Sequence, residues 1–130
     1  MSNAGTTARI LIVEDNDKNM KLARDILQAQ GYATLEAVTG EEGVRLAREH
    51  VPDLVLMDIQ LPGINGIEAL RQLRAEPATA GIPVVAVTAS VMQTDRREIT
   101  AAGFDGYIGK PISLRPFIES VREHLKKGLA

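Results

Sequence analysis

Short apolar runs alternate along the chain with longer segments in which apolar residues recur every three or four positions. Three continuous runs cover residues 10–13, 54–57 (in an expected strand over 53–57) and 82–87, and two weaker runs cover residues 32–38 and 106–108. Apolar runs of this length, bounded by turn residues, are typical of buried strands. The pattern therefore predicts five strands.

A helix is expected after each of these strands: in the segments 17–30, 40–50, 91–102 and 114–125, and in a third helix that begins at Asn65 and buries Ile67, Leu70 and Leu73. Thr39 stands three residues before Glu42, which is the spacing of a capping box, and Asn65 is a suitable N-cap for the third helix. The helix over 91–102 carries few apolar residues, which indicates shallow packing. Residues 77–81 are expected to form a loop.

Five consecutive strand–helix units predict an α/β protein of the flavodoxin-like type. We expect a (βα)5 doubly wound fold, in which helices cover both faces of a parallel five-stranded sheet of order 2-1-3-4-5. One domain is predicted over residues 9–126. Residues 1–8 are expected to be disordered or a remnant of an expression vector, and residues 127–130 a frayed tail.

Composition narrows the choice of partners. The chain has 130 residues and a formal net charge of −2, which gives no support for direct nucleic-acid binding. It has no cysteine, which fits a reducing compartment, and no apolar stretch near the roughly 20 residues of a membrane span. We therefore expect a cytoplasmic protein that contacts neither nucleic acid nor membrane.

Reactive side chains follow four of the five predicted strands: Glu14 and Asp15, then Asp58, then Thr88, then Lys110. The carboxyl ends of parallel strands meet at one edge of a sheet, so these groups should lie together. Crowded carboxylates repel one another, and a hard divalent cation such as Mg²⁺ or Mn²⁺ would relieve that repulsion. A carboxylate nucleophile beside a cation, an ammonium and a hydroxyl suits a transferring phosphoryl group. Any one of these residues alone would more often be an ordinary polar strand end.

This set of residues, in this order, resembles the receiver domain of bacterial two-component response regulators, of the single-domain, DivK-like type. The resemblance extends from about Arg9 to Leu125, and Pro62, Gly63 and Gly66 match the loop after the phosphoacceptor. It implies a signalling protein that takes a phosphoryl group from a histidine kinase or phosphotransfer protein. Such a protein catalyses only its own phosphorylation and dephosphorylation.

The resemblance also implies individual roles. Asp58 would be the phosphoacceptor, and Mg²⁺ would be held by Glu14, Asp15, Asp58 and the backbone carbonyl of Gln60. Lys110 and Thr88 would contact the phosphoryl group, as would Ala89, and Thr88 would act with Tyr107 as the switch pair. The Lys110–Pro111 bond would be cis. A downstream protein would bind the face formed by the helix over 91–102, the last strand and the last helix. Glu14 is a departure, since many relatives have aspartate there.

Two other readings are compatible with the sequence. A haloacid-dehalogenase-type phosphatase also uses a strand-end aspartate, but that family has a second aspartate two residues later, where this chain has Gln60. The chain could also be a receiver cut from a larger regulator or hybrid kinase.

Three further side chains have ordinary structural explanations. His50 and His124 fall near predicted helix C-termini, where a cation is stabilised by the helix dipole. Without the family resemblance, Tyr107 would be taken as a half-buried strand aromatic.

Overall fold

The computed structural model describes residues 7–89 and 93–129. The expected strand end at Ser90 and helix start at Val91 lie outside these residues. In chain order the elements are β1 (Arg9–Val13), α1 (Asp17–Ala29), β2 (Ala33–Ala37), α2 (Gly40–His50), β3 (Leu54–Asp58), α3 (Gly66–Ala75), α4 (Pro77–Ala80), β4 (Val84–Thr88), α5 (Gln93–Ala102), β5 (Gly106–Gly109) and α6 (Leu114–Leu129).

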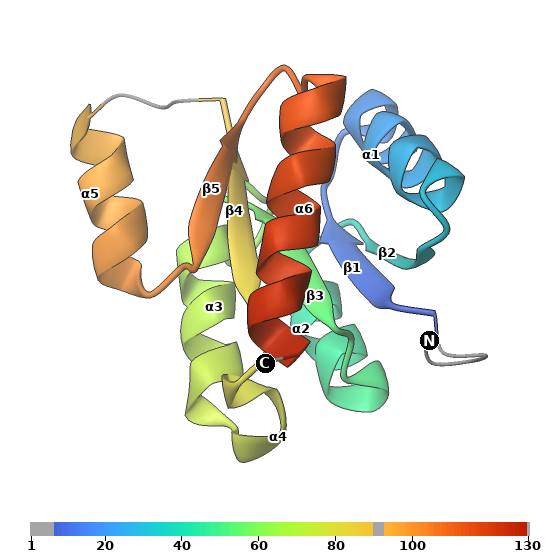
Figure 1. The fold of residues 1–130 in the computed structure, drawn as a ribbon. Coiled ribbons are helices and arrows are strands. Elements are labelled where there is room, and N and C mark those ends of the chain that lie inside the picture. Colours follow the sequence, from blue (N-terminus) through green and yellow to red (C-terminus); the bar gives the residue numbers. More distant parts are fainter. Residues whose placement is uncertain (1–6, 90–92, 130) are drawn as a thin grey trace.

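The five strands form one parallel sheet of order β2-β1-β3-β4-β5, which confirms the predicted topology (Figure 1). β1 lies between β2 and β3, with Val13 paired to both Ala37 and Met57. On the other side of β3, Asp58 pairs with Val87 of β4. The ends of the central strands are therefore level with one another at the carboxyl edge.

Alternate residues of each strand face opposite layers of helices. Ile10 and Ile12 of β1 belong to the core cluster on the side of α1 and α6, whereas Leu11 and Val13 belong to the cluster on the side of α2, α3 and α5. The central strand β3 is buried along its whole length. This two-sided burial explains why the strands read as continuous apolar runs.

The capping residues identified in the sequence begin their helices as expected. Thr39 Oγ1 accepts a hydrogen bond from Glu42 N, and Glu42 Oε1 accepts one from Val38 N, both at 3.0 Å. The first bond is that of a capping box, whereas Glu42 reaches back to the residue before the cap and not to the N–H of Thr39 itself. Asn65 Oδ1 accepts from Glu68 N at 2.9 Å and caps α3.

The expectation of a loop over residues 77–81 was wrong, because Pro77–Ala80 forms the single turn α4. Proline fits the first turn of a helix, where its missing N–H has no intrahelical partner. Thr79 is fully buried and donates its hydroxyl to Leu73 O at 2.7 Å, which fastens the turn to the end of α3.

His50 is the last residue of α2, as expected, but the interpretation of His124 was wrong. α6 continues to Leu129, so His124 lies inside the helix and is buried, with 7% of its surface exposed. Its Nδ1 lies 2.7 Å from Ser120 O and its Nε2 lies 3.3 Å from Asp105 O. The imidazole therefore joins α6 to the residue before β5.

None of the helices that the structure describes is long and apolar enough to cross a membrane.

Candidate functional site

The side chains that follow the parallel strands meet at the carboxyl edge of the sheet. Glu14 and Asp15 follow β1, Asp58 is the last residue of β3, and Lys110 follows β5. A cavity of 390 Å³ at this edge is lined by Glu14, Asp15, Asn16, Asn19, Asp58, Gln60, Ala89 and Lys110. The fold thus brings together residues that are far apart in the sequence.

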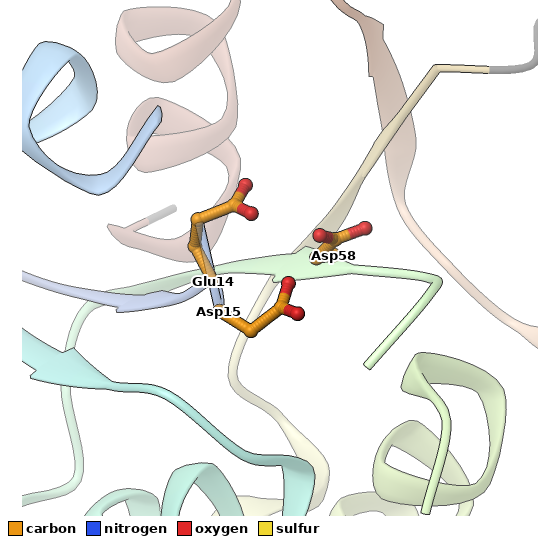
Figure 2. Close-up of side chains that lie close together, drawn as sticks. All are labelled: Glu14, Asp15 and Asp58. Atoms are coloured by element: carbon orange, nitrogen blue, oxygen red, sulfur yellow. The ribbon is translucent and has the colours of Figure 1, made fainter. Parts of the chain in front are cut away.

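Three carboxylates form the acidic centre of this site (Figure 2). Oxygen atoms of Glu14, Asp15 and Asp58 all lie within 4.8 Å of one another. Glu14 and Asp58 are buried, at 4% and 5% exposure, whereas Asp15 is exposed. The cluster is therefore open to solvent on the side of Asp15.

Lys110 is paired with both buried carboxylates. Its Nζ lies 2.9 Å from Glu14 Oε1 and 3.0 Å from Asp58 Oδ2. Its backbone N–H donates to Thr88 O at 2.8 Å, which fixes the loop after β5 against the end of β4. The Lys110–Pro111 peptide bond is cis, as the family resemblance implied.

Burial and pairing change the pKa of two of these groups, Glu14 and Lys110. Burial raises the pKa of Glu14, the hydrogen bond from Lys110 partly offsets this, and the negative charge of Asp58 raises it further. Burial disfavours the charged form of Lys110. Its hydrogen bonds to Glu14 and Asp58, and their negative charges, outweigh that effect and raise its pKa. Lys110 is thus held as a cation inside the acidic cluster.

The remaining carboxylate oxygens are oriented by backbone donors. Asn16 N donates to Glu14 Oε2 at 3.2 Å, and Gln60 N donates to Asp58 Oδ1 at 3.1 Å. Glu14 therefore uses one oxygen for Lys110 and the other for the backbone. Asp15 offers the exposed carboxylate of the cluster.

The donor set fits a hard divalent cation. Carboxylate oxygens converge on one open cavity, Gln60 lies on its wall, and three negative charges outnumber the single ammonium. Mg²⁺ and Mn²⁺ prefer oxygen ligands of this kind and retain some of their water.

Thr88 and Tyr107 lie on neighbouring strands near this site. Thr88 is buried at the end of β4, with 6% of its surface exposed, and pairs with Gly109. Tyr107 lies two residues before Gly109 on β5, pairs with Ala86 and is 37% exposed. Tyr107 is therefore a partly exposed strand aromatic, and its part in a switch stays a prediction.

Asn16 and Asn19 were not predicted from the sequence as parts of the cavity wall. Asn16 caps α1 by accepting a hydrogen bond from Asn19 N at 2.9 Å. Its position directly after Asp15 was the available signal, because a helix that begins at the carboxyl edge must place its first turn beside the strand-end residues.

Comparison with known proteins agrees with this geometry. Residues 10–122 match the family model described as the response regulator receiver domain. The chain is 48% identical over 119 residues to the polar-differentiation response regulator DivK of Brucella ovis, covering 92% of this chain and 97% of that relative.

Solved structures give the same result. The CheY-like receiver domain protein of Methanospirillum hungatei is 30% identical, with a TM-score of 0.85, over 95% of this chain and 98% of that one. The receiver domain of the sensor histidine kinase PA1611 from Pseudomonas aeruginosa is also 30% identical, with a TM-score of 0.87, over 93% of this chain and 99% of that one. That structure has a magnesium ion coordinated in its active-site cleft.

Proposed function

The chain belongs to the response regulator receiver domain family of two-component signalling, and from this premise we propose that Asp58 is its phosphoacceptor. Receiver domains interact with histidine kinases or phosphotransfer proteins and with downstream targets. In this proposal a phosphohistidine of such a partner supplies the phosphoryl group, in the cytoplasm. The chain catalyses only its own phosphorylation and dephosphorylation.

The observation that carries the proposal is the position of Asp58 between an ammonium and an open acidic cavity. Lys110 Nζ holds Asp58 Oδ2 at 3.0 Å, and Gln60 N holds Oδ1 at 3.1 Å, so the carboxylate is fixed in orientation. One of its oxygens attacks phosphorus and forms the acyl phosphate, while the bond to the donor imidazole breaks. Lys110 is placed to neutralise the charge on the phosphoryl oxygens.

Mg²⁺ is the proposed cofactor. The residues that would hold it are Glu14, Asp15, Asp58 and the backbone carbonyl of Gln60. When bound, the cation would neutralise charge shared by the carboxylates and the incoming phosphoryl oxygens. The donor set supports this, as does the magnesium ion in the cleft of the PA1611 receiver domain.

Thr88 and Tyr107 are the proposed switch pair. Thr88 donates its hydroxyl to the phosphoryl group and Ala89 contacts it, so the end of β4 moves toward Asp58. Tyr107 then changes rotamer into the space that Thr88 leaves. Among the α5 residues whose side chains the structure describes, Ile99 is the one that is buried. Moving this helix should therefore cost little free energy.

The downstream partner is proposed to bind the face formed by α5, β5 and α6. A groove of 180 Å³ on this face is lined by Tyr107, Ile108, Gly109, Ser113, Pro116, Phe117 and Ser120. The exposed ring of Tyr107 lies at its wall, so a rotamer change there alters the shape that a partner meets. The face would bind protein, not nucleic acid or membrane.

Residue mapping tests the identity of the phosphoacceptor. The protein is incubated with acetyl phosphate and Mg²⁺ and then reduced with borohydride, which converts an aspartyl phosphate to homoserine. Homoserine at position 58 is the expected result. Homoserine at Asp15 or another carboxylate, with Asp58 intact, would refute the assignment.

Amide chemical shifts with and without beryllofluoride, a phosphoryl mimic, test the switch. Large shifts are expected at Tyr107 and along α5, in addition to the loops around Asp58. Shifts confined to those loops would show that this chain lacks the switch.

A further inference from the structure

The loop between β3 and α3, residues 59–65, carries Gln60 and is fixed at both ends. Gln60 N donates to Asp58 Oδ1 at 3.1 Å, and Gly66 N donates to Ile59 O at 2.9 Å. A Cβ on Gly66 would overlap the carbonyl oxygen of Asp58, so the end of the loop lies directly on the end of β3. The middle of the loop, at Gly63 and Ile64, is held by other contacts.

The first turn of α2 lies against that middle part. Gly40 is buried, and a Cβ added to it would be 2.7 Å from Ile64 Cγ1 and 2.8 Å from the backbone oxygen of Ile64. Contacts this short leave no room for a side chain at position 40. Glycine therefore allows the backbone of α2 to touch the backbone of the loop.

Glu41 extends this contact across the loop. Its Oε2 accepts a hydrogen bond from Ile64 N at 3.4 Å. Its carboxylate also lies over Gly63, where an added Cβ would be 2.7 Å from Oε2 and 2.8 Å from Oε1. Gly63 has a φ of +74°, a conformation that glycine adopts without strain. At Gly63 no side chain separates the loop backbone from the carboxylate of Glu41.

Glu41 is not needed to begin the helix. The cap hydrogen bonds of Thr39 and Glu42 already do that, and farther along the helix Gly43 packs directly on Val13. A Cβ at Gly43 would be 2.8 Å from Val13 Cγ2. Because Val13 directly precedes Glu14, α2 touches both chain segments that supply oxygen atoms to the acidic cavity.

We propose that Glu41 is a positioning residue that, with Gly40, docks the β3–α3 loop on α2 and so sets the place of the Gln60 carbonyl at the cation site. The inference rests on the proposed function for its cation. α2 then determines how far Gln60 stands from the carboxylates of β1 and β3. A weaker contact between α2 and the loop lowers the affinity for Mg²⁺ without altering any carboxylate of the cluster.

Three variants test this in the full chain: Glu41→Ala, Glu41→Gln and the control Glu49→Ala. Glutamine keeps an oxygen acceptor for Ile64 N but removes the charge. Glu49 is an exposed carboxylate of the same helix that pairs with Arg45 at 3.1 Å, away from the loop. Two quantities are measured in each: hydrogen exchange of the Ile64 amide, and the dissociation constant for Mg²⁺ alone from amide shifts.

Glu41→Ala is expected to speed exchange at Ile64 and to weaken Mg²⁺ binding, each by about threefold, the size of one modest hydrogen bond. In Glu41→Gln the exchange rate of the Ile64 amide and the dissociation constant for Mg²⁺ should both stay near the wild-type values. Glu49→Ala should change neither quantity. The proposal is overturned if Mg²⁺ affinity is unchanged in Glu41→Ala. It is also overturned if Glu41→Gln behaves like Glu41→Ala, because net charge would then explain the effect. Neither measurement needs phosphorylation, so failure of Asp58 to accept a phosphoryl group would leave this test intact.

Discussion

The ammonium of Lys110 lies 3.0 Å from Asp58 Oδ2, although the two residues are 52 positions apart in the chain. The same ammonium lies 2.9 Å from Glu14, so it serves as the internal counter-ion of two buried carboxylates. The proposed Mg²⁺ would bind oxygens of the same two carboxylates, so it would compete with this ammonium for them.

Lys110→Ala is expected to slow phosphorylation by acetyl phosphate by at least about tenfold, because a preorganised positive charge at the phosphoryl oxygens is lost. It should also lower the free energy of unfolding in metal-free buffer by about 2 kcal/mol, since two buried carboxylates lose their partner. Mg²⁺ should restore part of that stability. Labelling kinetics and urea unfolding with and without Mg²⁺ measure these effects. A variant as fast and as stable as wild type would show that the ammonium has no role.

Asp15→Asn removes the exposed carboxylate of the cluster. We expect its affinity for Mg²⁺ to fall by about tenfold or more, as is common when a metal site loses a well-placed group. In metal-free buffer its thermal unfolding midpoint should rise, because like-charge crowding with Glu14 and Asp58 is relieved. Asp17→Asn is the matched control, an exposed carboxylate in the first turn of α1 outside the cavity wall. Equal Mg²⁺ affinity in the two variants would contradict the ligand set.

Glu14 gives a pH dependence whose sign follows from its raised pKa, which burial causes first of all. A group that binds its proton more tightly in the folded state stabilises the fold while protonated, and that contribution is lost as pH rises. The loss begins near the ordinary pKa of glutamate, about 4.3, and is complete above the folded pKa. Wild type should therefore lose stability relative to Glu14→Gln as pH rises through this window. Denaturant unfolding in chelator-containing buffers across the window checks the sign, and a difference that grows in favour of wild type would contradict it.

His124 fills the space that Gly106 leaves empty. A Cβ at position 106 would be 2.6 Å from His124 Nε2, so Gly106→Ala should lower the free energy of unfolding by about 1–3 kcal/mol, the usual effect of overpacking. Gly81→Ala is the control, since nothing lies within 4 Å of its added Cβ. In a double-mutant cycle, Gly106→Ala should cost less when His124 is alanine. Additive effects would show that the two positions do not interact.

The fold followed from the sequence because the central strands β1, β3 and β4 are apolar runs, and because α1, α2 and α3 each begin at a capping side chain. The site followed for a related reason, since residues after parallel strands must meet at one edge. α4 escaped prediction because one turn is too short to show a helical period. The burial of His124 depends on α6 continuing past Leu125 and on the close approach of Gly106.

The contact of Glu41 with Ile64 also lay beyond sequence reasoning. It depends on how closely α2 approaches the β3–α3 loop, and that distance is set by packing at Gly40. Thr39 and Glu42, in contrast, make a local contact that their spacing alone predicts. The features that could not be predicted are therefore long-range packing contacts, whereas caps and strand ends are local features that the sequence predicts.

The central claim is that Asp58 accepts a single phosphoryl group with the help of a divalent cation. Intact-mass measurement after incubation with acetyl phosphate tests it most directly, with and without Mg²⁺, on wild type and on Asp58→Asn. The account predicts one acid-labile phosphoryl group on wild type with Mg²⁺, none with chelator, and none on Asp58→Asn, which keeps the shape of the side chain but not its nucleophilic charge. Stoichiometric labelling of Asp58→Asn at another residue, or labelling of wild type that ignores Mg²⁺, would contradict it.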